Sequence, residues 1–188
     1  YVVAANDGRI LFRHNQTSHV AFSYRVYAEA GGLTLPGPSG RNGFPHPTAS
    51  PDGYQGPIVP PTLVTLENAP FSKNDPWLAP GATTTVGNNV AAYSDSFIVN
   101  GFGPAASSEC NVSLPVDGDM RACTNGANTF DYVYDTNLEP NASRTQVMAA
   151  VTNLFYLVNF MHDWYYDAGF DEVSGNGQTS NYGRGGLA

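Results

Sequence analysis

Residues 143–169 read SRTQVMAAVTNLFYLVNFMHDWYYDAG, and this stretch decides the fold. Its apolar side chains recur at spacings of three and four residues, the pattern of one helix face, at positions 147, 148, 151, 154, 155, 158, 161 and 165. Ser143 and Gln146 match a capping box, in which the Ser143 hydroxyl accepts from the Gln146 amide and the Gln146 side chain reaches back to residue 143. Gly169 suits the left-handed turn that commonly ends a helix. We therefore predict a helix from about residue 143 to residue 168.

The predicted helix is long for a chain of 188 residues. About 25 residues, at a rise of about 1.5 Å each, give a length of ~37 Å, which is enough to cross the core. Aromatic side chains lie on several sides of it: Phe155, Tyr156, Phe160, Trp164, Tyr165 and Tyr166. We therefore expect the helix to be buried and to be contacted on more than one face.

Short strands are expected in the rest of the chain. Residues 1–13 hold two apolar runs around a turn at residues 6–8, a pattern typical of a hairpin. Between residues 19 and 27, aromatic and apolar residues at 22, 24 and 26 alternate with polar ones, which predicts a strand with one buried face. Further short strands are predicted at 58–66, 89–97 and 130–134. The fold class is therefore α+β: mostly short antiparallel strands and loops, with one long buried helix near the C-terminus.

Two loop segments carry expectations of their own. Eight prolines and seven glycines fall between residues 31 and 61, so no helix or strand is expected to run through this segment. We expect Phe44 and Tyr54 to pin it to a neighbouring surface, and a flexible linker between domains is the alternative. Trp77, in the loop at 74–81, is predicted to be a buried anchor.

Composition argues against two classes of partner. The formal net charge is −8 and the eight Lys and Arg residues are scattered, whereas phosphate binding needs clustered basic side chains. The sequence has no run of about 18 apolar residues that would predict a membrane-spanning helix. We therefore expect neither nucleic acid nor a membrane as a partner.

The cysteines and three Asn-x-Ser/Thr triplets indicate an exported protein. Cys110 and Cys123 are predicted to close a short loop through a disulfide, which stabilises a fold by roughly 3 kcal/mol, and two buried free thiols are the alternative. Asn15, Asn111 and Asn141 each begin such a triplet and are candidate glycan acceptors. Together these features favour a secreted, extracellular protein.

The sequence contains no complete catalytic motif that we recognise. It lacks His-Glu-x-x-His, the motif that places two zinc ligands on one helix face beside a general base. His162 and Asp163, at the edge of the apolar helix face, are the one pair of polar side chains that we consider as a candidate site. A metal ligand or a general base is one interpretation. We favour a hydrogen-bonded histidine beside a solvated stripe at 159, 163 and 167, because no further ligand has matching spacing. The adjacent acids at 171–172 are too few to predict a calcium site.

Residues 151–178, followed by 181–186, resemble a stretch of the fungalysin family of secreted zinc metalloendopeptidases. In that family an Asn-Leu-Phe-Tyr helix continues into His-Asp, then Tyr and Gly-Phe, then acidic residues and Gly-Asn. The matching positions here are 153–156, 162–163, 169–170, 171–172 and 175–176. Leu157-Val158 and Gly177 depart from the pattern. Residues 1–12 are similar to the closing strands of the family's propeptide, and residues 21–27 are similar to the start of the mature domain.

The resemblance implies the N-terminal lobe of an enzyme with a thermolysin-like fold. The family's zinc lies on a His-Glu-x-x-His helix, with a further Glu downstream, and this helix would follow Ala188. No catalytic or metal-binding residue is therefore transferred to this chain, and no calcium site is assigned. The implied organisation is a propeptide tail at 1–18, a β- and loop-rich part at 19–142, and the long helix with its following loop at 143–188.

The function expected from the resemblance is structural. This chain would support the active site without being catalytic alone, while the full-length protein would be the zinc endopeptidase. Its partners would be the C-terminal catalytic part of the same protein and protein or peptide substrates. Two alternatives stay open: a non-enzymatic, secreted, β-rich binding module, and a propeptide-like inhibitor that binds a protease.

Overall fold

The computed structural model describes residues 2–3, 6–7, 10–12, 20–29, 31–37, 60–71, 75–95, 103, 110 and 119–187. In these residues the elements follow in the order β1 (Val2–Val3), β2 (Ile10–Phe12), β3 (Phe22–Val26), β4 (Thr62–Leu66), β5 (Thr129–Phe130) and α1 (Arg144–Asp167). The predicted α+β class, with one long helix near the C-terminus, is confirmed. Strands β1 and β2 pair antiparallel around a turn at residues 6–7, so the predicted hairpin is confirmed as well.

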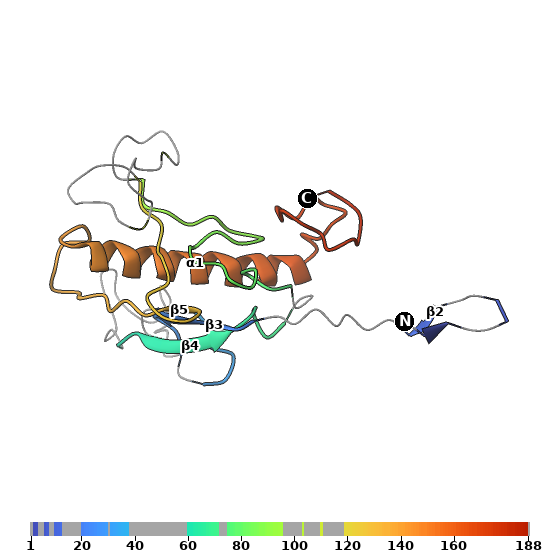
Figure 1. The fold of residues 1–188 in the computed structure, drawn as a ribbon, viewed down its shortest axis with the longest axis horizontal. Helices are drawn as coiled ribbons and strands as arrows, with labels where there is room; N and C mark the ends of the chain where they lie inside the picture. Colours follow the sequence, from blue (N-terminus) through green and yellow to red (C-terminus); the bar gives the residue numbers. More distant parts are fainter. Residues whose placement is uncertain are drawn as a thin grey trace, which may run out of the picture.

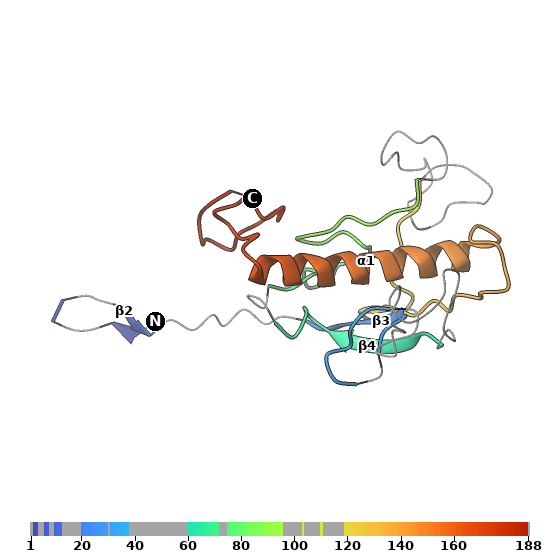
Figure 2. The ribbon, with the colours of Figure 1, turned by 180° about the vertical axis from the view of Figure 1, so that it is seen from behind.

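A three-stranded sheet of order β4-β3-β5 lies against α1 (Figures 1 and 2). Strand β3 pairs antiparallel with β4, from Phe22 opposite Leu66 to Val26 opposite Thr62. The side chains of β3 alternate between buried and half-buried, as their sequence pattern predicts. Strand β5 runs parallel to β3, which the sequence did not indicate.

Strand β5 is shorter than the predicted strand at 130–134. It ends at residue 130 because the side chain of Asn125 takes up the next backbone groups. The Asn125 amide donates to the Asp131 carbonyl oxygen at 2.6 Å, and its oxygen accepts from the Asp131 N–H at 2.9 Å. A backbone group that is bonded to a side chain cannot continue a strand ladder.

The prediction of a strand over 89–97 is wrong for residues 89–95. This part of the chain runs alongside α1 (Figure 1), and its pairing with other described residues consists of isolated bridges, one from Val86 to Ala91 and one from Ser94 to Met120. The predicted strand at 58–66 is confirmed over 62–66. Residues 58–59 and 96–97 lie outside the described residues, as do Phe44, Tyr54, Asn15 and Asn111.

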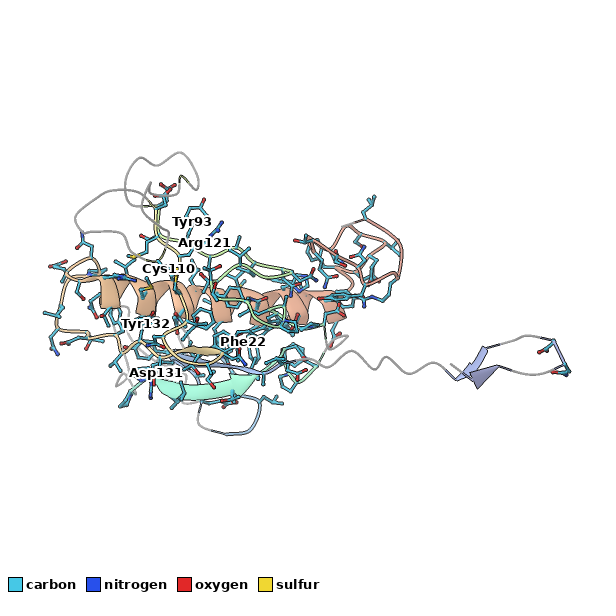
Figure 3. The ribbon with its side chains drawn as sticks, in the orientation of Figure 1. Phe22, Tyr93, Cys110, Arg121, Asp131 and Tyr132 are labelled. Carbon is cyan, nitrogen blue, oxygen red and sulfur yellow. A yellow bond between two sulfur atoms is a disulfide. The ribbon has the colours of Figure 1, made fainter. Side chains whose placement is uncertain are left out.

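The core is an aromatic cluster between the sheet and α1, where side chains fill the space between the ribbons (Figure 3). Tyr24 lies at its centre, with ring centroids 5.6 Å from Phe130 and 6.0 Å from Phe155. Trp77 and Tyr156 pack on it from the loop and the helix. Trp77 is 0% exposed, which confirms the predicted buried anchor.

The two ends of α1 show how local sequence sets a helix boundary. The Ser143 hydroxyl accepts from the Gln146 N–H at 3.2 Å, as predicted. The predicted return bond from Gln146 is wrong: its amide group instead binds the backbone N–H and carbonyl of Asp135, at 2.7 Å each. Gln146 thereby ties the incoming loop to the helix. At the other end, Gly169 adopts the predicted left-handed conformation, with φ of 106°.

Cys110 and Cys123 form a disulfide, with their Cα atoms 5.7 Å apart. Cys123 belongs to the buried core, so the disulfide anchors residue 110 to the core. None of the helices in the described part of the chain is both long and apolar enough to cross a membrane.

Candidate functional site

Asp163 is a buried carboxylate at the centre of the polar groups near the end of α1. Its Oδ2 accepts from the Trp77 indole N–H at 2.8 Å and from the backbone N–H of Ala69 at 3.1 Å. The predicted solvated stripe is therefore wrong at two of its three positions: Asp163 is 4% exposed and Asn159 is 0% exposed, whereas Asp167 is exposed as predicted. The physical reason is that the indole N–H of a buried tryptophan needs an acceptor, and α1 supplies one.

His162 joins Asp163 to the loop that follows the helix. Its Nδ1 lies 3.1 Å from Asp163 Oδ1, and its Nε2 lies 3.0 Å from the carbonyl oxygen of Asn176. The imidazole packs near the rings of Tyr166 and Phe170. Both ring nitrogens therefore have protein partners, and the described residues contain no group of three or more His, Cys, Asp or Glu side chains that could hold a metal.

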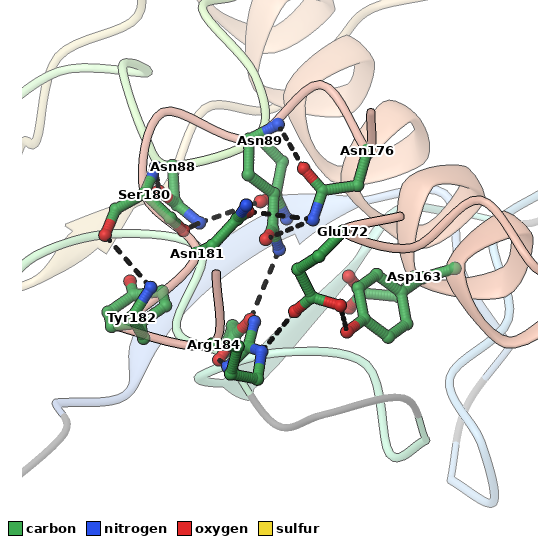
Figure 4. A network of polar contacts seen from close by, with 12 residues as sticks. Asn88, Asn89, Asp163, Glu172, Asn176, Ser180, Asn181, Tyr182 and Arg184 are labelled. Carbon is green, nitrogen blue, oxygen red and sulfur yellow. Dashed lines mark hydrogen bonds and ion pairs between the residues drawn. The ribbon is translucent and has the colours of Figure 1, made fainter. Parts of the chain in front are cut away.

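The loop over residues 170–187 is organised by asparagine side chains (Figure 4). The Asn176 amide donates to Gln178 Oε1 at 2.8 Å and to Asn181 Oδ1 at 2.9 Å. Asn181 in turn donates to the carbonyl oxygens of Gly185 and Leu187, at 2.8 and 3.0 Å. Side-chain amides thus bind backbone groups of this loop, which has no helix or strand.

Arg184 lies between two carboxylates that come from distant parts of the chain (Figure 4). Its guanidinium binds Asp75 through two nitrogens, one of them at 3.0 Å from Asp75 Oδ1, and its Nε binds Glu172. The Tyr166 hydroxyl donates to the other oxygen of Glu172 at 2.5 Å. A planar guanidinium suits such two-point binding, which orients as well as attracts.

These contacts shift the pKa values of the network. The hydrogen bond from Tyr166 and the pairing with Arg184 lower the pKa of Glu172 to about 2. Burial, together with the hydrogen bond to Glu172, raises the pKa of Tyr166 to about 12. The hydrogen bond to Asp75 is the main cause that raises the pKa of Arg184 above its usual value. Near neutral pH Glu172 and Arg184 are therefore charged and paired, while the neutral Tyr166 hydroxyl donates to Glu172.

A second connection runs from the loop to the segment before residue 90. Asn88 and Ser180 exchange two hydrogen bonds, from Asn88 Nδ2 to the Ser180 carbonyl at 3.1 Å and from the Ser180 N–H to Asn88 Oδ1 at 2.9 Å. Gln178 also donates to Asp75 at 3.2 Å. Residues 75–88, the end of α1 and residues 176–184 thus form one connected unit, which we call the helix-end network.

Sequence reasoning missed most of the helix-end network. It identified His162 and Asp163 but assigned no role to Asp75, Asn176 or Arg184. The glycines around Arg184 were a usable signal, because residues 183, 185 and 186 all have positive φ. A Cβ at Gly186 would overlap the carbonyl of Glu172, which explains a glycine there.

Chemically, the helix-end network holds segments together and offers no reaction centre that we can identify. Its polar side chains bind one another. The adjacent acids at 171–172 serve different partners: Asp171 accepts from the Val173 N–H at 3.0 Å, whereas Glu172 binds Arg184 and Tyr166. The residues described here therefore do not fit a catalytic zinc site, which needs three protein ligands around an open position.

Comparisons with known proteins agree on one family. The profile of the fungalysin metallopeptidase (M36) family matches residues 44–188. Extracellular metalloproteinase 5 of Trichophyton tonsurans is 33% identical over 141 residues, which cover 71% of this chain and 20% of the relative. The protein of the same name from Arthroderma otae is 34% identical over 142 residues, with the same coverage of 71% and 20%.

A shorter stretch is more similar to another relative. Extracellular metalloproteinase 1 of Arthroderma otae is 47% identical over 57 residues, which cover 30% of this chain and 9% of the relative. The chain spans about a fifth of the length of the relatives that match most of it. No solved structure matches it. The family profile covers most of the sequence, including α1 and the helix-end network, and the chain therefore belongs to the fungalysin metallopeptidase (M36) family.

Proposed function

We propose that this chain is the N-terminal lobe of a secreted, zinc-dependent metalloendopeptidase and that it supports the active site without being catalytic alone. The family match over residues 44–188 is the observation that carries the proposal. The relatives are named extracellular metalloproteinases, which supports export and protein or peptide substrates for the full-length protein. We place the zinc and its ligands in the C-terminal catalytic part, because the sequence lacks His-Glu-x-x-His and the described residues do not fit a zinc site.

The supporting role is consistent with the helix-end network. A loop without helix or strand normally varies in conformation, yet residues 170–187 are tied to α1 through His162 and to the preceding segment through Arg184. The rigid helix therefore fixes this loop in one place. In the proposed enzyme this loop and α1 form part of one wall that positions the catalytic part. We place the propeptide tail at 1–18, outside the family match, and the lobe at 19–188.

The proposal is tested on the full-length protein, exported from a fungal or yeast host. We expect one tightly bound zinc and cleavage of a generic protein substrate such as casein, abolished by a chelator and restored by zinc. The 188-residue chain alone should show neither activity nor bound zinc. A full-length protein that binds no zinc and cleaves no protein would contradict the proposal, and would favour a binding module or an inhibitor.

The supporting role needs its own test. Asp163→Ala in the full-length protein should lower both the yield of exported protein and kcat/KM, because it releases the loop from α1. Glu139→Ala, at an exposed position in the turn before α1, is the control and should leave both unchanged. Full activity in Asp163→Ala would show that the wall does not depend on this network.

A further inference from the structure

An apolar hollow of about 270 Å³ opens beside the first half of α1. Most of its lining is carbon: Tyr93, Pro140, Val147, Ala150, Val151 and Leu154. Leu154, one of several exposed apolar side chains of α1, is 43% exposed. Tyr93 borders the hollow from the segment that runs above the helix (Figure 3). The hollow is therefore an open, mainly apolar surface on α1.

Asn141 is exposed and also lines this hollow. It lies in a turn in which the Ala142 N–H donates to the Glu139 carbonyl oxygen at 3.0 Å, directly before α1. Asn141-Ala142-Ser143 is a triplet that accepts N-linked glycans, which are found on surface loops of exported proteins. Of the three triplets in the sequence, it is the one that falls entirely in the described part of the chain.

We propose that Asn141 carries an N-linked glycan whose first sugar lies in this hollow, against Tyr93 and Leu154. The acceptor side chain already borders the hollow, so the first N-acetylglucosamine needs no long reach. One face of a pyranose ring presents C–H groups and its edge presents hydroxyls. The C–H face packs on apolar and aromatic side chains while the hydroxyls stay in water, as amphipathic side chains do at other surfaces.

The glycan has a structural consequence. It covers apolar surface on the first half of α1 and keeps this face towards solvent, so the face is not available for packing against another part of the protein. The inference rests on the export stated in the proposed function. The test below therefore supplies its own export signal, so that the two proposals can fail separately.

The first measurement is the occupancy of Asn141 in the full-length protein, exported from yeast behind a supplied signal peptide. After the Cys110–Cys123 disulfide is reduced and alkylated, trypsin releases Ala122–Arg144, a peptide that contains this triplet and neither of the other two. We expect most of this peptide to carry a glycan that peptide-N-glycosidase F removes with conversion of Asn141 to Asp. An unmodified peptide in the exported protein overturns the proposal.

Ser143 allows matched variants, because it serves both the triplet and the helix cap. Ser143→Thr keeps both roles and should keep the glycan. Ser143→Asp keeps a capping oxygen but destroys the triplet, so the glycan should be lost without loss of the cap. Asn141→Gln should lose the glycan as well. Retention of a glycan on the same peptide in Ser143→Asp would contradict the assignment.

The place of the first sugar is tested by stability. Endoglycosidase H leaves one N-acetylglucosamine on the asparagine, so it should not lower the Tm. Asn141→Gln and Ser143→Asp should both lower the Tm relative to Ser143→Thr, since they leave the hollow bare. Equal Tm values in all variants would overturn the placement in the hollow. An exported, glycosylated protein that cleaves no substrate would leave this inference standing while the proposed protease fails.

Discussion

Replacement of Asp163 tests whether a single carboxylate holds the core and the following loop together. Asp163→Ala leaves two buried donors without an acceptor, the indole N–H of Trp77 and the backbone N–H of Ala69. Asp163→Asn keeps an acceptor oxygen for both donors but removes the charge. The two variants therefore separate the loss of the hydrogen bonds from the loss of the charge.

The expected magnitudes follow from the contacts of Asp163. A buried donor without a partner costs about 1–3 kcal/mol, so the two donors in Asp163→Ala predict a loss of about 2–6 kcal/mol in the free energy of unfolding. Hydrogen bonds to a charged acceptor contribute about 1.5–3 kcal/mol, and those to a neutral acceptor about 0.5–1.5 kcal/mol. Asp163→Asn is therefore expected to lose about 2 kcal/mol. The first loss is a large share of the ~5–15 kcal/mol typical of a domain.

The assay uses the fact that Trp77 and Trp164 are the two tryptophans of the chain. Trp77 is 0% exposed and Trp164 is 64% exposed, so a Trp164→Phe background leaves the emission of Trp77 as the reporter of the core. Urea unfolding followed by this emission measures each free energy of unfolding. Glu139→Ala serves as the exposed control and should cost less than about 1 kcal/mol.

Two results would refute the reasoning about Asp163. A loss below about 1 kcal/mol in Asp163→Ala would mean that other groups or water satisfy the two donors. Equal losses in Asp163→Ala and Asp163→Asn would mean that the acceptor oxygens matter less than the charge opposite His162.

Three further predictions address other parts of the molecule. Tyr24→Phe should leave the Tm unchanged or raise it, because the buried Tyr24 hydroxyl has no hydrogen-bond partner among the described residues; a Tm several degrees lower would reveal a partner. Gly87→Ala should lower the free energy of unfolding in urea by about 1–3 kcal/mol, since its Cβ would overlap the Trp77 carbonyl oxygen. An unchanged free energy of unfolding would show that the backbone of this loop shifts to make room for the methyl group. The depressed pKa of Glu172, about 2, means that its contribution to stability is complete above the unfolded pKa near ~4.3 and is lost as the pH falls from about 5 to about 2. Limited proteolysis of the loop around Arg184 should therefore become faster in the wild type as the pH falls from about 5 to about 2. In Glu172→Gln the rate of proteolysis should depend less on pH.

Local signals in the sequence predicted the elements that depend on near neighbours. Three- and four-residue spacing with Ser143 and Gly169 at the ends was sufficient to place α1 within one or two residues. Alternation was sufficient to identify the buried face of β3, and two cysteines 13 positions apart were sufficient to favour a disulfide. Each of these patterns reflects a contact or a period within a few residues of the chain, where backbone geometry alone restricts the outcome.

The sequence could not predict which distant groups meet. Gln146 was expected to close its own cap and instead binds Asp135, because a loop brings that backbone within reach. Strand β5 pairs parallel with β3 although more than 100 residues separate them in the sequence.

By itself, the sequence determined the long helix, strands β3 and β4 and the family, and it favoured the disulfide, since these rest on local periodicity and on a motif of consecutive residues. Only the tertiary structure decided that Asp163 is buried beneath Trp77 and that Arg184 lies between Asp75 and Glu172. The reason is that a polar side chain looks the same in a sequence whether it faces water or a buried donor. Its role is settled by the groups that folding places around it, here from segments 86 and 109 residues away.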